Sequence, residues 1–268
     1  MTAPETMLIL AAHGSPFTSA RQALAGFVRR VQGRHPGVRV LFAGTAMRHP
    51  HRADETPAME KTLESLAKAP HGAPMTVRVQ SLHVIAGTEF DRMREQCLRF
   101  ARQTGADVKI AGPLLSGAFD APLVARTLAE SLAQSPVGNA SGEAMVLMGH
   151  GTTHAAQELY RILAAHLTSI RPLAFLGVLE AADAKNPLSV HTIARSLAGQ
   201  GITHARLVPF LTVAGRHAHK DLAGEEPGSW KSILAGYGIE GASDLTGLVE
   251  REAFARLWLA GVDTLLTG

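Results

Sequence analysis

The sequence predicts an α/β protein made of two similar doubly wound domains with parallel sheets, related by internal duplication. An apolar run that ends in His-Gly occurs at 8–15 (LILAAHGS) and again at 145–152 (MVLMGHGT). A second matching pair follows, SLHVIAG at 81–87 and PFLTVAG at 209–215. Short apolar runs also alternate with stretches of helical periodicity, which is typical of βαβ units. A repeat of this kind constrains the whole architecture.

In the first half, apolar runs are expected to be strands and the stretches between them helices. The expected strands are 7–12, 38–43, 76–83 and 108–113. Helices are expected to begin near Thr18, Asp54 and Glu89. Within 19–31 the apolar residues lie on one face at helical spacing and there is no proline, which favours a helix.

The second half follows the same plan. Strands are expected at 144–148, 173–179 and 205–213, and helices at 153–167 and 189–198. The turn-rich stretch 135–142 has no periodicity, so we place the boundary there, with domains 1–138 and 139–268 and the metal site in the second. The last segment, 248–266, has helical spacing and is expected to pack back on the first domain.

Composition excludes several classes of function. The net charge of +3 comes from scattered basic residues without a Lys/Arg block, which argues against nucleic-acid binding. Cys97 is the only cysteine, so an intrachain disulfide and a cysteine-based zinc site are excluded. No apolar run approaches a membrane span and the N-terminus does not resemble a signal peptide, so we expect a cytoplasmic protein without membrane contact.

Two histidines and one glutamate, His150, Glu180 and His217, each follow an expected strand of the second half. Doubly wound domains bind ligands at the carboxyl ends of their strands. Two imidazoles and a carboxylate suit a borderline divalent metal such as Co, Ni, Fe or Zn. Taken singly, each residue has a plainer explanation as a loop, cap or hydrated side chain, so the metal site depends on their convergence. His219 stands two residues after His217, and in an extended loop both would face the same way.

Together, several segments of the chain resemble the class II tetrapyrrole chelatases, and the closest match is the anaerobic sirohydrochlorin cobaltochelatase family. The segments that carry the resemblance are VQSLHVIAG at 79–87, MGHG at 148–151, GVLE at 177–180, PFLTVAGRHAHKD at 209–221, GEEP at 224–227 and SWK at 229–231. The similarity spans nearly the whole chain, and 209–231 is its most diagnostic part.

The resemblance implies a chelatase-like fold with an active-site cleft between the two domains. It implies ATP-independent insertion of Co²⁺ into sirohydrochlorin, with release of two protons, in cobalamin or related tetrapyrrole synthesis. The metal is then a substrate, and no organic cofactor is expected. The positions that match the family's metal ligands are His150, Glu180 and His217, which would also be catalytic. Neutral imidazole can both bind a metal and accept pyrrole protons near neutral pH.

Five further residues are predicted to contact the substrate: His13, His83, Glu89, Arg216 and His219. The family usually has Asp where this chain has Arg216, and often Asn where it has Lys220. The added positive charge is suited to the acetate and propionate groups of sirohydrochlorin.

Three alternatives stay open at this point. Within the chelatases, insertion of Fe²⁺ or Ni²⁺ is the nearest, because the ligand set does not select one metal sharply. A non-enzymatic protein that binds and delivers a tetrapyrrole or a metal is the second. A metal-dependent hydrolase is the third, and it would need more acidic ligands than the sequence offers. The assembly state is open and includes a homo-oligomer.

Overall fold

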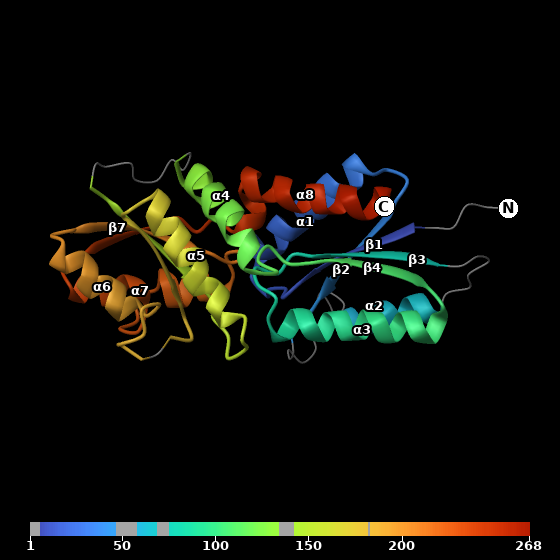
Figure 1. Cartoon of the computed structure of the whole chain (residues 1–268), viewed down its shortest axis with the longest axis horizontal. Helices are drawn as coiled ribbons and strands as arrows, with labels where there is room; N and C mark the ends of the chain where they lie inside the picture. The colour runs from blue at the N-terminus through green and yellow to red at the C-terminus, as the bar shows by residue number, and fades with distance from the viewer. Residues whose placement is uncertain (1–5, 47–57, 69–74, 134–141, 182) are drawn as a thin grey trace. The chain divides into compact units, whose positions relative to one another are not determined.

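The computed structural model describes residues 6–46, 58–68, 75–133, 142–181 and 183–268 (Figure 1). The chain forms two compact units, which we call unit 1 (Met1–Ser116 with Ala255–Gly268) and unit 2 (Gly117–Phe254). The expected linker at 135–142 lies outside the described residues except for Gly142.

Unit 1 contains a four-stranded parallel sheet in the order β2-β1-β3-β4. Its strands are β1 (Thr6–Ala12), β2 (Arg39–Gly44), β3 (Thr76–Ser81) and β4 (Asp107–Ala111). Its helices are α1 (Thr18–Arg34), α2 (Met59–Lys68), α3 (Thr88–Thr104) and most of α8 (Glu252–Thr267). Helices α2 and α3 cover one face of the sheet, and α1 and α8 cover the other (Figure 1).

Unit 2 repeats this plan with a parallel sheet in the order β6-β5-β7-β8. Its strands are β5 (Ala144–Gly149), β6 (Ala174–Val178), β7 (His204–Pro209) and β8 (Glu240–Ser243). Its longer helices are α4 (Ala121–Ala133), α5 (Gln157–Ile170), α6 (Val190–Gly199) and α7 (Trp230–Gly236). Three short helical segments complete the described structure, η1 (Ala118–Asp120), η2 (His217–Leu222) and η3 (Leu248–Glu250). The predicted fold class is confirmed.

The central strands read as continuous apolar runs because both faces of each sheet are covered by helices. Residues Met7 to Ala12 of β1 and all residues of β5 are buried. The core of unit 2 joins the sheet to α6 and α7, and it includes Trp230 at the start of α7. The single thiol, Cys97, is buried in the core of unit 1, and burial raises its pKa to about 12, so it is unreactive.

The chain passes from unit 2 back into unit 1 within the final helix. Helix α8 begins in unit 2 and belongs to unit 1 from Ala255 onward. There the indole of Trp258 meets the ring of Phe27 edge-on, with centroids 6.3 Å apart. Asp263 accepts hydrogen bonds from the guanidinium of Arg34 at 2.8 and 2.6 Å. From Ala255 onward, α8 therefore packs with α1 in the helical layer that covers one face of the unit 1 sheet.

Strand β7 ends earlier than expected, at Pro209 instead of Val213. The chain leaves the sheet there because the carbonyl oxygens of Leu211 and Thr212 accept hydrogen bonds from η3 rather than from a neighbouring strand. This departure carries the chain from the sheet edge into η2. Strand β8 and helices α4 and α7 were not anticipated.

Candidate metal centre

The candidate site lies at the carboxyl ends of β6, β5 and β7, which are adjacent in the sheet of unit 2. His150 follows the central strand β5, whereas Glu180 follows β6 on one side and His217 follows β7 on the other. The chain connections diverge on either side of β5, which makes this edge the topological switch point where open α/β sheets bind ligands. The fold therefore brings the three predicted residues to one edge, with His150 in the middle.

The turn that holds His150 requires a glycine on each side. A side chain at Gly149 would lie 2.6 Å from the ring of Tyr160, and Gly151 has a φ of +86°. The buried hydroxyl of Tyr160 hydrogen-bonds the backbone of Gly151 and His150, and burial raises the pKa of this phenol. Nδ1 of His150 lies 3.2 Å from the carbonyl oxygen of Gly151, to which it donates a hydrogen bond when protonated. Nε2 is then the nitrogen left for a ligand.

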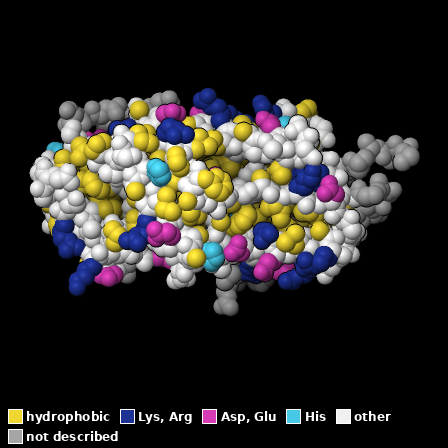
Figure 2. Space-filling model, in the orientation of Figure 1, with side chains coloured by type: hydrophobic (Ala, Val, Ile, Leu, Met, Phe, Trp, Pro, Cys, Tyr) yellow, Lys and Arg dark blue, Asp and Glu magenta, His cyan; other side chains and the backbone are white. Residues whose placement is uncertain are grey.

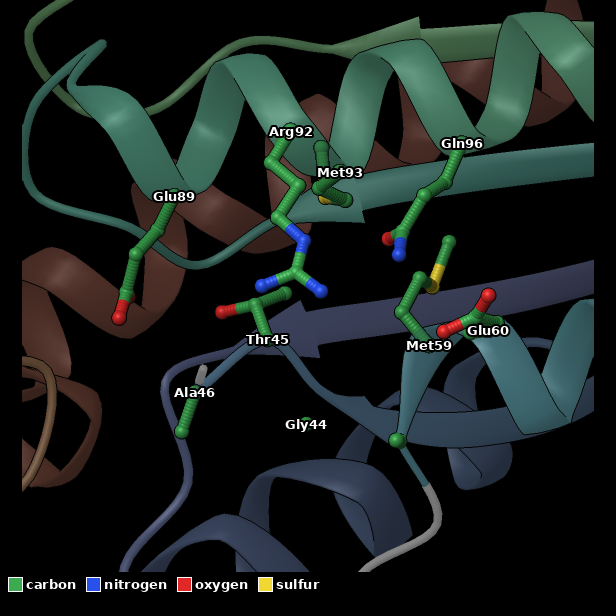
Figure 3. A pocket seen from close by; sticks show the side chains of 10 residues that line it. Gly44, Thr45, Ala46, Met59, Glu60, Glu89, Arg92, Met93 and Gln96 are labelled. Atoms are coloured by element: carbon green, nitrogen blue, oxygen red, sulfur yellow. The ribbon is translucent and has the colours of Figure 1, made fainter. Parts of the chain in front are cut away.

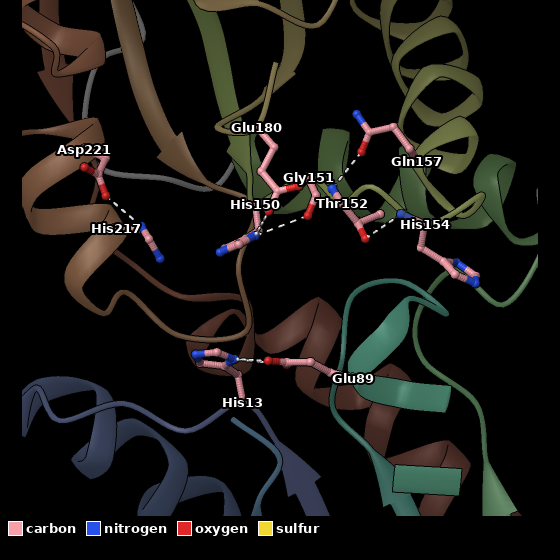
Figure 4. A network of polar contacts seen from close by, with 10 residues as sticks. All are labelled: His13, Glu89, His150, Gly151, Thr152, His154, Gln157, Glu180, His217 and Asp221. Atoms are coloured by element: carbon pink, nitrogen blue, oxygen red, sulfur yellow. Dashed lines mark hydrogen bonds and ion pairs between the residues drawn. The ribbon is translucent and has the colours of Figure 1, made fainter. Parts of the chain in front are cut away.

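His217 is the first residue of η2, a single stretch of π-helix. Its Nδ1 lies 2.6 Å from Oδ2 of Asp221, one turn further on. The rings of His150 and His217 are 4.9 Å apart between centroids, with an angle of 85° between their planes. Figure 4 shows the outer nitrogens of both rings directed into the same space. With side chains 46% and 41% exposed, both histidines are accessible to a ligand from solvent.

Glu180 is placed on the opposite flank of His150. One of its carboxylate oxygens, Oε1, lies 3.6 Å from Nδ1 of His150, the nitrogen that faces Gly151 (Figure 4). Across the described ranges, no three His, Cys, Asp or Glu side chains form a ready-made metal cluster. Two imidazoles are thus close together, and the carboxylate stands beside one of them with its side chain 42% exposed.

The expectation that His217 and His219 face the same way is wrong. It assumed an extended loop, but this segment is helical, and residues two apart on a helix do not share a face. Arg216 precedes η2 and is exposed, and its guanidinium makes no hydrogen bond or ion pair with another described residue. The guanidinium of Arg216 is therefore available to bind an anion. The side chains of His217 and His219 lie on different faces of η2.

Strand registers align the two repeats independently of sequence similarity. The registers match the paired residues of β1, β2 and β3 with those of β5, β6 and β7, and counting on from the strand ends without gaps extends the match into the segments that follow. The corresponding pairs are His13 and His150, Ala46 and Glu180, Glu89 and His217, and Met93 and Asp221. Unit 1 therefore keeps one of the four polar residues unchanged, and unit 2 alone carries the complete set.

At the corresponding edge of unit 1, His13 and Glu89 form a direct pair. Nδ1 of His13 lies 2.7 Å from Oε1 of Glu89, and this hydrogen bond raises the pKa of His13 (Figure 4). The ring of His83 is buried, with Nε2 2.8 Å from the hydroxyl of Thr45 and Nδ1 2.8 Å from the hydroxyl of Ser81. Burial lowers the pKa of His83 to about 4, so this ring is neutral at pH 7 and both its nitrogens are occupied.

A small hollow opens beside this pair, within unit 1 (Figure 3). Its lining includes Thr45, Glu89, Arg92 and Gln96, together with Met59 and Met93. Arginine and glutamate on one wall suit a polar ligand better than an apolar one.

Charged side chains of both signs are mixed on the drawn face of the described residues (Figure 2). On the face drawn in Figure 2, Lys and Arg side chains alternate with Asp and Glu. Among the helices described, none is long and apolar enough to cross a membrane.

Asp221 and Tyr160 are the residues near the site that sequence reasoning missed. The sequence could have pointed to Asp221, because it follows His217 by four positions, the spacing of neighbouring side chains on a helix. The spacing was not recognised as helical, because this segment was expected to be an extended loop. No sequence feature pointed to Tyr160, because it fits the pattern of buried positions along α5.

Comparisons with known proteins agree on one family. A family model described as cobalt chelatase (CbiK) matches residues 6–266. The sirohydrochlorin cobaltochelatase CbiKC of Nitratidesulfovibrio vulgaris is 35% identical over 254 residues, 94% of this chain and 87% of the relative. The sirohydrochlorin cobaltochelatase of Salmonella typhimurium is 30% identical over 202 residues, 75% of this chain and 73% of that one.

Among solved structures, SirB from Bacillus subtilis with Fe³⁺ matches with a TM-score of 0.67 and 15% identity. The match covers 98% of this chain and 96% of SirB. At this identity the likeness shows the fold, a two-unit chelatase-like α/β architecture.

Proposed function

This chain belongs to the cobalt chelatase (CbiK) family, and from that membership we propose that it inserts Co²⁺ into sirohydrochlorin without ATP. Insertion replaces the protons of two pyrrole nitrogens by the metal, so two protons leave the ring. The metal is a substrate that must first be held and then released, and the macrocycle carries carboxylate side chains that need cationic partners.

The observation that carries the proposal is the pair of exposed imidazoles, His150 and His217, 4.9 Å apart between centroids. In each ring Nδ1 faces an acceptor of the protein, which leaves Nε2 to bind the metal. Two nitrogen donors hold a borderline dication without closing its coordination shell. An open shell leaves positions for the pyrrole nitrogens as the metal is transferred.

The same nitrogens are suited to take up the protons. While Nε2 of a histidine binds Co²⁺, its lone pair is occupied. When the metal moves to the ring, that lone pair becomes free beside a pyrrole N–H and can accept its proton, while the electron pair of the N–H bond stays on the pyrrole nitrogen. We propose that His150 and His217 act in this way, and that Glu180, whose exposed carboxylate adjoins His150, ligates the metal or relays the proton.

Contacts with the macrocycle stay predictions. The exposed guanidinium of Arg216 next to His217 is suited to pair with a carboxylate of the ring. His13 is exposed and Glu89 and His219 are partly exposed, whereas His83 is buried with both ring nitrogens bonded, so its contribution would be indirect.

The test is turnover under anaerobic conditions. Purified protein, sirohydrochlorin and Co²⁺ should change the visible spectrum of the macrocycle faster than the reaction without protein. We expect His150→Ala and His217→Ala each to lower the insertion rate by about 100-fold or more, the scale of a lost acid–base group. His204→Ala is the matched control, because His204 lies at the opposite end of β7 and is exposed.

Insertion at the wild-type rate in both alanine variants would exclude this site. A wild-type protein that binds the ring and Co²⁺ but does not accelerate insertion would instead be a binding or delivery protein. Competition among Co²⁺, Fe²⁺ and Ni²⁺ for one pool of macrocycle measures the metal preference, which imidazole and carboxylate ligands alone do not determine.

A further inference from the structure

We infer that Asp221 is a positioning residue that fixes the ring of His217 for metal binding. The inference rests on the proposed function, in which His217 holds Co²⁺. Asp221 does not itself need to touch the metal or the macrocycle. It acts through the imidazole, by determining which of its two nitrogens carries the proton.

The contact between the two side chains is short and specific. Oδ2 of Asp221 lies 2.6 Å from Nδ1 of His217. A carboxylate only accepts hydrogen bonds, so Nδ1 must be the protonated nitrogen and Nε2 carries the lone pair. Metal-binding histidines commonly donate their second ring N–H to a carboxylate, which orients the ring and makes it a better donor to the metal.

The backbone between the two residues is held so that this contact forms. Both belong to η2, in which Ala218 and Leu222 are buried and anchor one side of the helix against unit 2. The amide of Ala223 donates to the carbonyl oxygen of Ala218, five residues back, which is the hydrogen bond of a π-helix. Such single-turn π segments are frequent at functional sites. On this turn the histidine and the aspartate, four residues apart, lie side by side.

The fold itself does not require a carboxylate at this position. The corresponding residue of unit 1 is Met93, which is buried in the core on the regular helix α3. In that repeat the position of His217 is held by Glu89, which needs no acceptor for a ring N–H. The carboxylate thus occurs in the repeat that has the histidine and is replaced by an apolar residue in the repeat that lacks it.

The two histidines of unit 2 are therefore held differently. Nδ1 of His150 is hydrogen-bonded to a backbone carbonyl at 3.2 Å, with the Glu180 carboxylate further away at 3.6 Å, whereas Nδ1 of His217 is hydrogen-bonded directly to a carboxylate at 2.6 Å. An ionised acceptor forms the stronger hydrogen bond and places more electron density on the ring. His217 is accordingly the stronger donor to the metal of the two, and removal of the carboxylate should weaken metal binding without removing a ligand.

The test compares Asp221→Ala, Asp221→Asn and Asp221→Glu with Glu225→Gln. Glu225 is an exposed carboxylate on the same segment that pairs with Lys231 and not with a histidine. The measurements are Co²⁺ affinity by competition with a chelating dye, and the tautomer of His217 from ¹⁵N NMR of the metal-free protein. We expect Asp221→Ala to lower Co²⁺ affinity about 10- to 100-fold. In the same variant, the fraction of His217 in the Nδ1–H tautomer should fall.

The other variants separate the contributions of charge and geometry. An asparagine offers both a donor and an acceptor, so Asp221→Asn should allow the wrong tautomer and lower the affinity as well. Asp221→Glu returns a carboxylate and should restore part of the affinity. Glu225→Gln should bind Co²⁺ as the wild type does.

Wild-type affinity and an unchanged tautomer in Asp221→Ala and Asp221→Asn would overturn the inference. A fall in affinity in these variants with the Nδ1–H tautomer retained would also overturn it, since Asp221 would then act on the metal directly. The tautomer is measured without metal or macrocycle, so it is independent of the proposed reaction. Failure of the proposed function would show separately, as a wild-type protein that does not accelerate insertion of Co²⁺ into sirohydrochlorin.

Discussion

Single residues of the candidate site were predicted from their positions after apolar strands. His150 and His217 were found in this way, because the carboxyl ends of neighbouring parallel strands must meet. The placement of Glu180 was less predictable. The order of strands in the sheet puts β5 between β6 and β7, so Glu180 and His217 lie on opposite sides of His150. Strand order is a property of the tertiary fold, and the spacing of residues in the sequence does not reveal it.

The buried His83 makes a testable contribution to stability. Burial lowers its pKa from 6.5 to about 4 in the folded protein. Between these values the unfolded chain binds a proton that the folded chain does not, so stability falls as the pH drops from 6.5 toward 4. We expect the thermal unfolding midpoint to fall between pH 7 and pH 5 by less in His83→Gln than in the wild type. The difference should correspond to roughly 1–3 kcal/mol.

The exposed His204 provides the control for this comparison, and His204→Gln should keep the pH dependence of the wild type. The paired His13 acts with the opposite sign. Its pKa is raised by Glu89, so its contribution is present at low pH and is lost as the pH rises through that value. An equal fall of the midpoint in wild type and His83→Gln would show that His83 does not remain neutral in the fold.

At the scale of elements, the buried parallel strands were the best predicted. All seven expected strands, β1 to β7, begin within one residue of expectation, because strands of a parallel sheet read as apolar runs. Strand β8 (EGAS) has no such run, so nothing in its composition marks it as a strand. The π-helix η2 was expected to be a loop, since its form depends on the anchoring of Ala218 and Leu222 in the core.

The end of η2 depends on a glycine. A side chain at Gly224 would collide with the backbone carbonyl of Lys220, the residue before Asp221. We expect Gly224→Ala to destabilise the protein by about 1–3 kcal/mol, the cost of forcing extra volume into a packed site. Because the displaced backbone carries Asp221, the variant should also lower Co²⁺ affinity. Unfolding and metal titration measure the two effects.

Gly228→Ala is the matched control for this variant. Gly228 lies in the same segment, has no atom within 4 Å of an added side chain and does not have a positive φ. It should therefore change neither the unfolding midpoint nor the metal affinity. Equal behaviour of the two alanine variants would mean that η2 tolerates the added atom and does not depend on Gly224.

At the scale of the whole molecule, duplication explains both the fold and the location of the site. Each unit has the same strand order and the same histidine after its first strand. The sequence showed the repeat through two pairs of similar segments, and the strand registers align the three paired strands of each half. This alignment identifies what unit 1 lacks: Ala46, Glu89 and Met93 stand where unit 2 has a glutamate, a histidine and an aspartate. The metal is therefore expected to bind to one repeat only.

The stoichiometry of Co²⁺ binding across the repeats tests this central claim most directly. Equilibrium dialysis with elemental analysis should find a single equivalent of Co²⁺ on the wild-type chain and the same amount on His13→Ala. The bound metal should be lost from His150→Ala and from His217→Ala. Loss of the metal from His13→Ala, with full binding by both unit 2 variants, would place the metal on the other repeat and contradict the account.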